Sequence, residues 1–327
     1  MMTINNENRL KFAFLFPGQG SQSVGMMQDL ASLNVVRATF AEASAVLNQD
    51  LWKLVADGPA EHLNLTSNTQ PLMLTAGIAT YRAWLAQGGC PPDAMAGHSL
   101  GEYTALVAAG AIDFADALPL VRLRAEAMQT AVAEGAGAMA AILGLDDDSV
   151  CAACAEAAQH EVLSAVNFNA PGQVVIAGHK AAVERGMLAA KERGAKRTLL
   201  LPVSVPSHCA LMRPAAIHLS AALAAIEIRK PVVPVLHNAD VQMHYDPERI
   251  RDVLVRQLYS PVRWVETIAV MANSGLSLAA ECGPGKVLAG LGKRMDVRVA
   301  TAALVNLAAM EEFKFSIERE PICLNKE

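Results

Sequence analysis

The chain has 327 residues, of which 53% are hydrophobic, 18% are charged and 5% are aromatic. This length and apolar content allow a large buried core, in one large domain or in two modest ones. The net charge of −5, without a basic tail or interleaved aromatic and basic residues, argues against a nucleic-acid partner.

Apolar segments of the chain are too short to place it in a membrane. No apolar run reaches the length of a membrane span. The first run, residues 12–16, is also too short for the core of a signal peptide and meets Pro17 and Gly18 at once. We therefore expect no membrane partner and a cytoplasmic location.

The cysteines are scattered in a way that does not indicate a disulfide framework. They are Cys90, Cys151, Cys154, Cys209, Cys282 and Cys323. The C-x-x-C pair at 151 and 154 falls in an Ala-rich helical pattern and has no second Cys or His pair at metal-ligand spacing. We expect two small apolar residues on a helix there, and no metal site.

Short apolar segments alternate with longer helical patterns in the first part of the chain. The predicted strands are 12–16 and 94–97, and the predicted helices are 35–47, 70–87, 115–132 and one that begins at Leu100. Pro119 is tolerable because it falls near the start of its helix. This alternation is typical of a mainly parallel sheet covered by helices, and so of an α/β protein.

The middle of the chain follows a different order. The pattern predicts strands at 138–143, 163–168, 173–177 and 197–203 and helices at 146–159 and 180–193. This βαββαβ order is the ferredoxin-like arrangement. We predict a small domain over residues 135–204, inserted in a large core formed by residues 1–134 and 205–309.

The last part of the chain returns to the α/β pattern and then loses it. Helices are predicted at 213–226 and 247–258, and a strand at 276–281. Residues 310–327 are charged, lack clear periodicity and contain Pro321. Two interpretations stay open for this tail, a disordered segment or a non-native extension, and neither assigns it a function.

Gly97-His98-Ser99-Leu100-Gly101 fits the pattern G-x-S-x-G, with an apolar strand before it and a helix after it. A sharp strand-to-helix turn exposes the serine side chain and needs glycines, because other side chains would clash there. The Leu100 amide would then lie at a helix N-terminus, where it can form half of an oxyanion hole. Ser99 is the candidate nucleophile.

A serine nucleophile needs a base, and the histidines differ in their surroundings. His98 is adjacent to Ser99, but its side chain should leave the turn in another direction. His237 follows an apolar run and is a weaker candidate than His208. His208 lies after a predicted strand, in a loop restrained by two prolines, and loops on a rigid scaffold often carry catalytic residues.

Arg124 falls on the apolar face of the helix predicted at 115–132, in line with Val121 and Met128. Arg122, by contrast, shares a polar face with Glu126, where we expect a solvated ion pair. A buried guanidinium needs an internal carboxylate, a path to water or an anionic ligand. In an acyl-transfer pocket, Arg124 would hold the free carboxylate of a dicarboxylic acyl group.

The motifs in this order resemble the bacterial malonyl-CoA:acyl carrier protein transacylases of fatty acid synthesis, from about residue 11 to about residue 303. They are Phe16-Pro17-Gly18-Gln19-Gly20-Ser21-Gln22, Gln70-Pro71, Gly97-His98-Ser99-Leu100-Gly101-Glu102, Arg124, Asn167-Phe168-Asn169, Val205-Pro206-Ser207-His208, Arg256-Gln257-Leu258-Tyr259 and Gly283-Pro284-Gly285. The resemblance implies a hydrolase-like α/β core with a small ferredoxin-like domain.

The resemblance also implies a role for each site residue. Ser99 is implied as the nucleophile and His208 as the general base, with the Gln19 and Leu100 amides as the oxyanion hole. Arg124 is implied as the group that holds the malonyl carboxylate. Gln257 resembles the family residue whose main-chain carbonyl orients the histidine.

The Gly18-x-Gly20 turn has a competing interpretation as a dinucleotide-binding loop. The third glycine of that pattern is misplaced, because Ser23 occupies its position, and no matching acidic residue follows. We therefore expect no nucleotide cofactor, and no cofactor of any kind beyond the two substrates.

The predicted reaction moves a malonyl group from malonyl-CoA through malonyl-Ser99 to the phosphopantetheine thiol of an acyl carrier protein. The alternatives are a polyketide acyltransferase acting in trans, a serine esterase or thioesterase, and a non-catalytic carrier-binding subunit. An acidic carrier would dock on a local basic patch. Two clusters are candidates: Lys180, Arg185, Lys191, Arg193, Lys196 and Arg197, or Lys286, Lys293 and Arg294.

Overall fold

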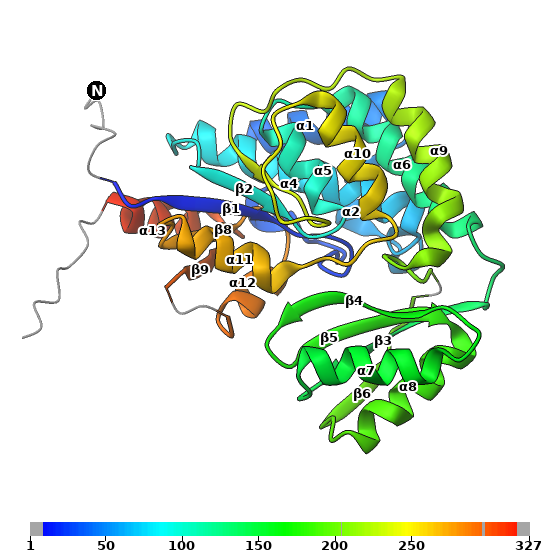
Figure 1. Ribbon diagram of the computed structural model, residues 1–327. Helices are drawn as coiled ribbons and strands as arrows, with labels where there is room; N and C mark the ends of the chain where they lie inside the picture. The colour runs from blue at the N-terminus through cyan, green and yellow to red at the C-terminus, as the bar shows by residue number, and fades with distance from the viewer. Residues whose placement is uncertain (1–8, 204, 296–297, 319–327) are drawn as a thin grey trace, which may run out of the picture.

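A parallel sheet forms the centre of the larger part of the molecule (Figure 1). The computed structural model describes residues 9–203, 205–295 and 298–318. Within these ranges the sheet has five strands in the order β7-β2-β1-β8-β9, and every neighbouring pair is parallel. The strands are β1 (Phe12–Phe16), β2 (Ala94–Gly97), β7 (Val235–Leu236), β8 (Leu278–Glu281) and β9 (Ala300–Ala303).

Helices cover both faces of this sheet, because strands such as β1 carry apolar side chains on both faces. Successive side chains of a strand point to opposite faces. Phe12, Phe14 and Phe16 enter the larger core, whereas Ala13 and Leu15 enter a second core beneath α11 and α12. All five residues are buried, as expected for a central strand of a parallel sheet.

The helices of the larger part follow the strands in alternation. They are α1 (Asn34–Leu47), α2 (Leu51–Asp57), α3 (Ala60–Leu63), α4 (Thr66–Ala86), α5 (Gly101–Ala108), α6 (Phe114–Thr130), α9 (Arg213–Ala224), α10 (Pro247–Gln257), α11 (Trp264–Asn273), α12 (Val287–Gly292) and α13 (Leu307–Glu318), with 3₁₀ turns at Gln28–Leu30 and Ala210–Met212. Among the described helices, none is long and apolar enough to cross a membrane.

A second, antiparallel sheet forms the smaller part, below the first in Figure 1. In the described chain it has four strands in the order β4-β5-β3-β6. Its elements are β3 (Gly137–Leu143), α7 (Asp147–Ala158), β4 (Leu163–Ala170), β5 (Gln173–His179), α8 (Lys180–Glu192) and β6 (Arg197–Leu200). The predicted fold class, a mainly parallel sheet with a βαββαβ unit, is confirmed.

The small sheet is joined to the large part along β4. The Phe168 amide donates to the Val262 carbonyl at 3.0 Å, and the Val262 amide donates to the Val166 carbonyl at 2.8 Å. One face of the small sheet packs on α7 and α8, and Met139 and Val175 lie on its other face with Cys209. The predicted boundary at residue 204 lies outside the described residues.

The first interpretation of the tail, a disordered segment, is wrong over residues 310–318. They belong to α13, whose Met310, Phe313 and Ile317 are buried in the larger core. The Phe313 ring lies 5.6 Å from that of Phe12 and 5.9 Å from that of Trp84. Charged residues separate these apolar positions, so the sequence pattern did not indicate a helix with one buried face. Residues 319–327 lie outside the described residues.

We expect Phe313→Ala to lower the free energy of unfolding by about 3–5 kcal/mol, because it leaves a cavity beside β1. Phe315 on the same helix is 57% exposed. Phe315→Ala is the matched control and should change the free energy by less than about 1 kcal/mol. Urea denaturation measures both, and equal losses would contradict the placement of α13 in the core.

Candidate active site

Ser99 lies in the turn between β2 and α5, with a backbone φ of 51°. A non-glycine residue rarely adopts this left-handed conformation. The turn is closed by close contacts at both glycines. A Cβ on Gly97 would lie 1.8 Å from the Gly101 carbonyl carbon, and a Cβ on Gly101 would lie 2.0 Å from the Phe16 oxygen. The sequence therefore needs glycine at both ends of a sharp turn that presents the serine hydroxyl.

His208 is in hydrogen-bond contact with Ser99. Its Nε2 lies 2.8 Å from Ser99 Oγ, and its Nδ1 lies 2.8 Å from the Gln257 carbonyl oxygen. Since a carbonyl only accepts, Nδ1 carries the proton and Nε2 is left to accept one from the hydroxyl. Burial, with the positive charge of Arg124, lowers the pKa of His208 to about 3. The imidazole is thus neutral at physiological pH, as a proton acceptor must be.

Arg124 reaches the same hydroxyl from α6. It is 1% exposed. Its guanidinium donates to Gln70 Oε1 at 2.9 Å, to Gln257 Oε1 at 3.0 Å and to Ser99 Oγ at 3.3 Å. Its Nε has no acceptor, and within the described residues no carboxylate pairs with it. A fully buried cation is thus held by two neutral amides and by the serine hydroxyl.

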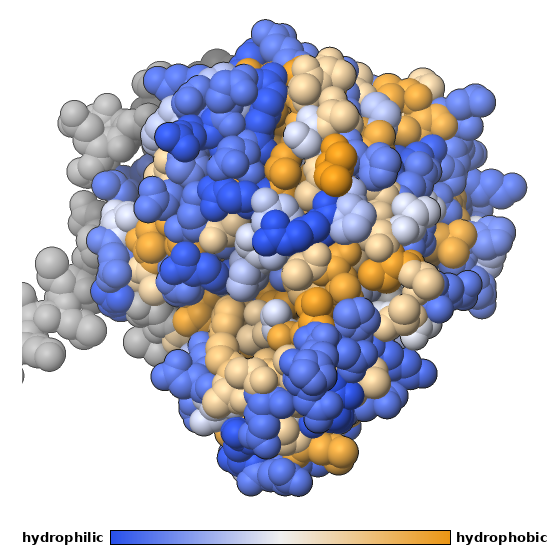
Figure 2. All heavy atoms as spheres, turned by 45° about the vertical axis from the view of Figure 1, so that its right-hand side comes forward, coloured by the Kyte–Doolittle hydropathy of each residue, from blue (hydrophilic) through white to orange (hydrophobic). Residues whose placement is uncertain are grey.

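A pocket of about 330 Å³ opens over these three side chains. Its walls come from both sheets, since Met139, Leu201 and Val203 line it from the smaller part. On the face shown in Figure 2, apolar residues gather where the smaller lobe meets the larger one. A pocket in which several polar groups converge beside apolar side chains is typical of a small-molecule site.

Gln19 and Leu100 also line this pocket. The loop that carries Gln19 packs tightly on the serine turn, since a Cβ on Gly18 would lie 2.5 Å from the His98 oxygen. Leu100 directly precedes α5. Neither the backbone N–H of Gln19 nor the backbone N–H of Leu100 has an acceptor among the described residues. Two backbone donors beside the hydroxyl are therefore free to bind an oxygen.

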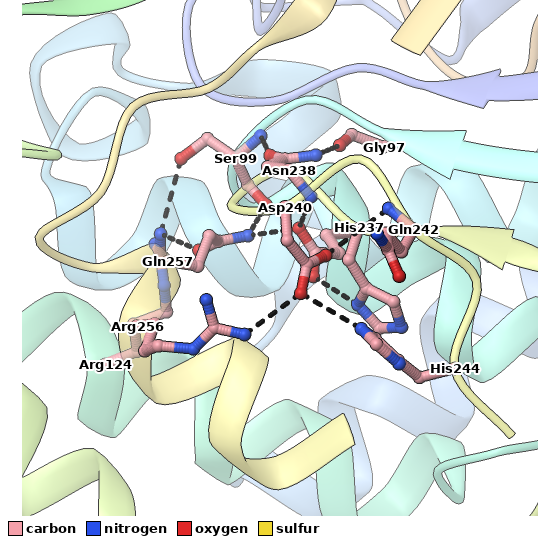
Figure 3. A network of polar contacts seen from close by, with 11 residues as sticks. Gly97, Ser99, Arg124, His237, Asn238, Asp240, Gln242, His244, Arg256 and Gln257 are labelled. Carbon is pink, nitrogen blue, oxygen red and sulfur yellow. Dashed lines mark hydrogen bonds and ion pairs between the residues drawn. The ribbon is translucent and has the colours of Figure 1, made fainter. Parts of the chain in front are cut away.

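A buried polar network supports the turn from behind (Figure 3). The Ser99 amide donates to Asn238 Oδ1 at 2.8 Å, and Asn238 Nδ2 donates to the Gly97 carbonyl at 2.7 Å. Asn238 thus clamps the turn on both sides of the serine. The backbone N–H of Asn238 donates to Glu102 Oε2 at 2.9 Å. Gln257 Nε2 also donates to the Ser99 carbonyl at 2.9 Å, so side chains from two other segments hold the serine turn.

Residues 13–307 match the acyl transferase domain family. The malonyl CoA-acyl carrier protein transacylase of Escherichia coli K12 is 59% identical over 92% of this chain and 97% of its own. The chain belongs to the malonyl CoA-acyl carrier protein transacylase family.

Solved structures agree with this membership. The acyl-carrier-protein S-malonyltransferase of Burkholderia pseudomallei is 58% identical and superposes with a TM-score of 0.92, over 94% of this chain and all (100%) of that one. A malonyl-transacylase in complex with a type II PKS acyl-carrier protein is 54% identical, with a TM-score of 0.91 over 94% of this chain and 99% of that one.

The other two histidines considered from the sequence have partners of their own. His98 lines the pocket, but its Nε2 is 2.8 Å from Asn169 Oδ1. His237 is fully buried and contacts Glu102 Oε1 at 2.7 Å through Nδ1. The expected ion pair between Arg122 and Glu126 is absent from the described residues, and Arg122 donates to Gln49 Oε1 instead.

Sequence reasoning missed three buried polar residues of the site. Gln70 and Asn238 received no role, although Gln70 holds Arg124 and Asn238 clamps the serine turn. Glu102 was noted only as the end of a motif. The one available signal was polarity in a mostly apolar setting, since Glu102 lies at the start of α5, which is rich in apolar residues, and Asn238 comes shortly after a buried strand.

We expect the imidazole of His208 to stay neutral, with its proton on Nδ1, from about pH 8 down to about pH 5, because its pKa is lowered to about 3. Histidine ¹⁵N NMR measures both properties, with His208→Gln to assign the signals. In denaturant the same histidine should titrate near pH 6.5. A protonation midpoint near 6 in the folded chain would contradict the burial of this side chain.

Proposed function

We propose that Ser99 carries the malonyl group that this transacylase moves from malonyl-CoA to the phosphopantetheine thiol of an acyl carrier protein. Family membership assigns the chain to malonyl transfer in fatty acid synthesis. The observation that supports the site is the convergence of His208 and Arg124 on one hydroxyl. Transfer needs a base at that position, and a malonyl substrate needs a cation.

In the first half-reaction Ser99 Oγ attacks the thioester carbonyl while His208 Nε2 takes the hydroxyl proton. The Gln19 and Leu100 amides hold the negative oxygen that forms. When the tetrahedral intermediate collapses, the carbon–sulfur bond breaks. The coenzyme A thiolate takes the proton from His208, which leaves malonyl-Ser99 and a neutral imidazole.

The second half-reaction repeats these steps with the carrier thiol. His208 takes the thiol proton, and the sulfur attacks the ester carbonyl of malonyl-Ser99. The carbon–oxygen bond then breaks and Ser99 regains its proton from His208. The Gln257 carbonyl keeps the imidazole oriented throughout, since it is 2.8 Å from Nδ1. These steps use only the chain and its two substrates. That the reaction needs no cofactor stays a prediction.

Arg124 selects the acyl group in this proposal. A malonyl carboxylate would accept two hydrogen bonds from the guanidinium. An acetyl group would leave a buried cation unpaired, and sites built for a polar group reject analogues that lack it far better than apolar pockets do. The same need for a carboxylate argues against a general serine esterase or thioesterase.

The carrier belongs to fatty acid synthesis, and a polyketide carrier is a second candidate because one similar structure is a complex with a type II PKS acyl-carrier protein. For docking we favour the cluster near β6, which leads directly to Leu201 and Val203 in the pocket wall. Two of its arginines, Arg185 and Arg193, are engaged in ion pairs. We therefore propose that Lys196 and Arg197 contact the carrier.

The cytoplasmic location also stays a prediction.

Ser99→Ala should abolish the malonyl adduct that forms on the chain after brief mixing with malonyl-CoA, because it removes the hydroxyl that contacts the base His208. Intact-protein mass spectrometry detects the adduct, and addition of the holo carrier protein should remove it from the unmodified chain. Ser207→Ala is a matched control, since Ser207 lines the same pocket and should leave the adduct in place. An adduct on Ser99→Ala would exclude Ser99 as the carrier of the acyl group.

Arg124→Ala should lower kcat/KM for malonyl-CoA by about 100-fold and relax the preference over acetyl-CoA, because the carboxylate loses its cation. Acyl-enzyme formation with each thioester measures this preference. Arg122→Ala, two positions earlier on α6 and bonded to Gln49, is the control and should keep the preference. If Arg124→Ala still prefers malonyl to the wild-type extent, another group binds the carboxylate.

A further inference from the structure

Glu102 is the buried acid nearest in sequence to Ser99, and it is fully buried in the first turn of α5. Its carboxylate receives three hydrogen bonds. They come from His237 Nδ1 at 2.7 Å, from the Asn238 amide at 2.9 Å and from Gln257 Nε2 at 2.8 Å. An ionised carboxyl, which has only acceptors, satisfies all three contacts. The chain therefore keeps a negative charge inside, close to the active site.

Gln257 connects this charge to Arg124 (Figure 3). Its Nε2 donates to Glu102 and to the Ser99 carbonyl at 2.9 Å, and its Oε1 accepts from Arg124 at 3.0 Å. These partners leave one orientation for the amide, because only the nitrogen can donate and only the oxygen can accept. The amide dipole thus lies between a buried anion and a buried cation, aligned with both.

We propose that Glu102 is the remote counter-charge of Arg124 and acts through Gln257 as a positioning residue that moderates the selectivity for malonyl. The inference rests on the proposed role of Arg124 in holding the malonyl carboxylate. A carboxylate in direct contact with Arg124 would occupy the face that the substrate needs. A site with no negative charge at all would leave a buried cation uncompensated. One amide between the two charges meets both requirements.

Electrostatics within the site agree with this arrangement. Burial lowers the pKa of Arg124, and its interaction with Tyr103 and then the negative charge of Glu102 oppose that shift. The same charge repels an incoming malonyl carboxylate. Removal of the charge should therefore strengthen the attraction between Arg124 and the substrate carboxylate, a group that an acetyl substrate lacks.

Glu102→Gln removes the charge and can keep every hydrogen bond. The amide oxygen of the new side chain can accept from Asn238 and Gln257, as Oε2 does in the native chain. The new amide nitrogen would face His237 Nδ1. The His237 proton can move to Nε2, which has no partner in the part of the chain that is described, so that Nδ1 becomes an acceptor. The variant thus separates the charge from the contacts.

The experiment compares acyl-enzyme formation by the wild-type chain and by Glu102→Gln, with malonyl-CoA and with acetyl-CoA. The ratio of the two kcat/KM values should rise about three- to tenfold in the variant, from the lost repulsion between like charges. A residue that only supports the fold would lower both rates together and leave the ratio unchanged. An unchanged or lower ratio overturns the proposal.

Glu281→Gln is the control, and both variants are compared at pH 8, because burial raises the pKa of Glu281 to about 7 and its carboxyl is ionised above that value. Glu281 is also a fully buried glutamate, at the end of β8; its Oε2 accepts from the Ala289 amide at 2.9 Å, and none of its described hydrogen bonds involves Arg124. Its ratio should equal that of the wild-type chain. A rise in this control as large as in Glu102→Gln would assign the effect to any buried charge and overturn the specific role of Glu102.

A second variant covers the case in which Glu102→Gln does not fold. Glu102→Asp keeps the charge and weakens the contacts, so its rates should fall while its ratio stays within about twofold of the wild-type value. A larger change of ratio there contradicts the proposal. Failure of the wild-type chain to form a malonyl adduct would instead overturn the proposed function, which separates the two results.

Discussion

Arg124 brings a positive charge into the interior where no described carboxylate touches it, and burial of an unpaired ion is strongly unfavourable. The guanidinium compensates by donating hydrogen bonds to neutral groups. Gln70 and Gln257 come from α4 and α10, and Ser99 comes from the turn before α5. These segments are far apart in the sequence. The position of the guanidinium therefore depends on how the larger part of the molecule is assembled.

The parallel sheet supplies that assembly. The strands β1, β2, β7 and β8 all run in one direction, so the segments that follow them meet at one edge of the sheet. The Gln19 loop, the Ser99 turn and Asn238 are three of these segments. Ligands of open parallel sheets bind beyond the carboxyl ends of the strands. The small sheet closes the pocket from the other side, because β4 is bonded to residue 262 and the chain after β6 lines the wall.

Periodicity predicted β1, β2 and the helices α1, α4, α5 and α6 within about four residues, but it predicted no helix at α2, α3, α11 or α12. It missed β7, which has two residues, and β9, which consists of small residues with no β-branched run. It also missed α13, where charged residues separate the buried positions. Arg124 could be found because it interrupts an apolar face. The contacts of Gln70, Asn238 and Glu102 could not, since they depend on which loops meet in space.

The way His208 is oriented follows from the same distribution of charge. A carboxylate bonded to Nδ1 would raise the pKa of the imidazole. Because His208 and Arg124 both contact Ser99 Oγ, that carboxylate would also lie near the guanidinium and compete with an acyl carboxylate for it. The Gln257 carbonyl fixes the tautomer without adding a charge. Gln257 thus orients the base with its backbone and the cation with its side chain, and the only acid behind them, among the residues described, stays one amide away.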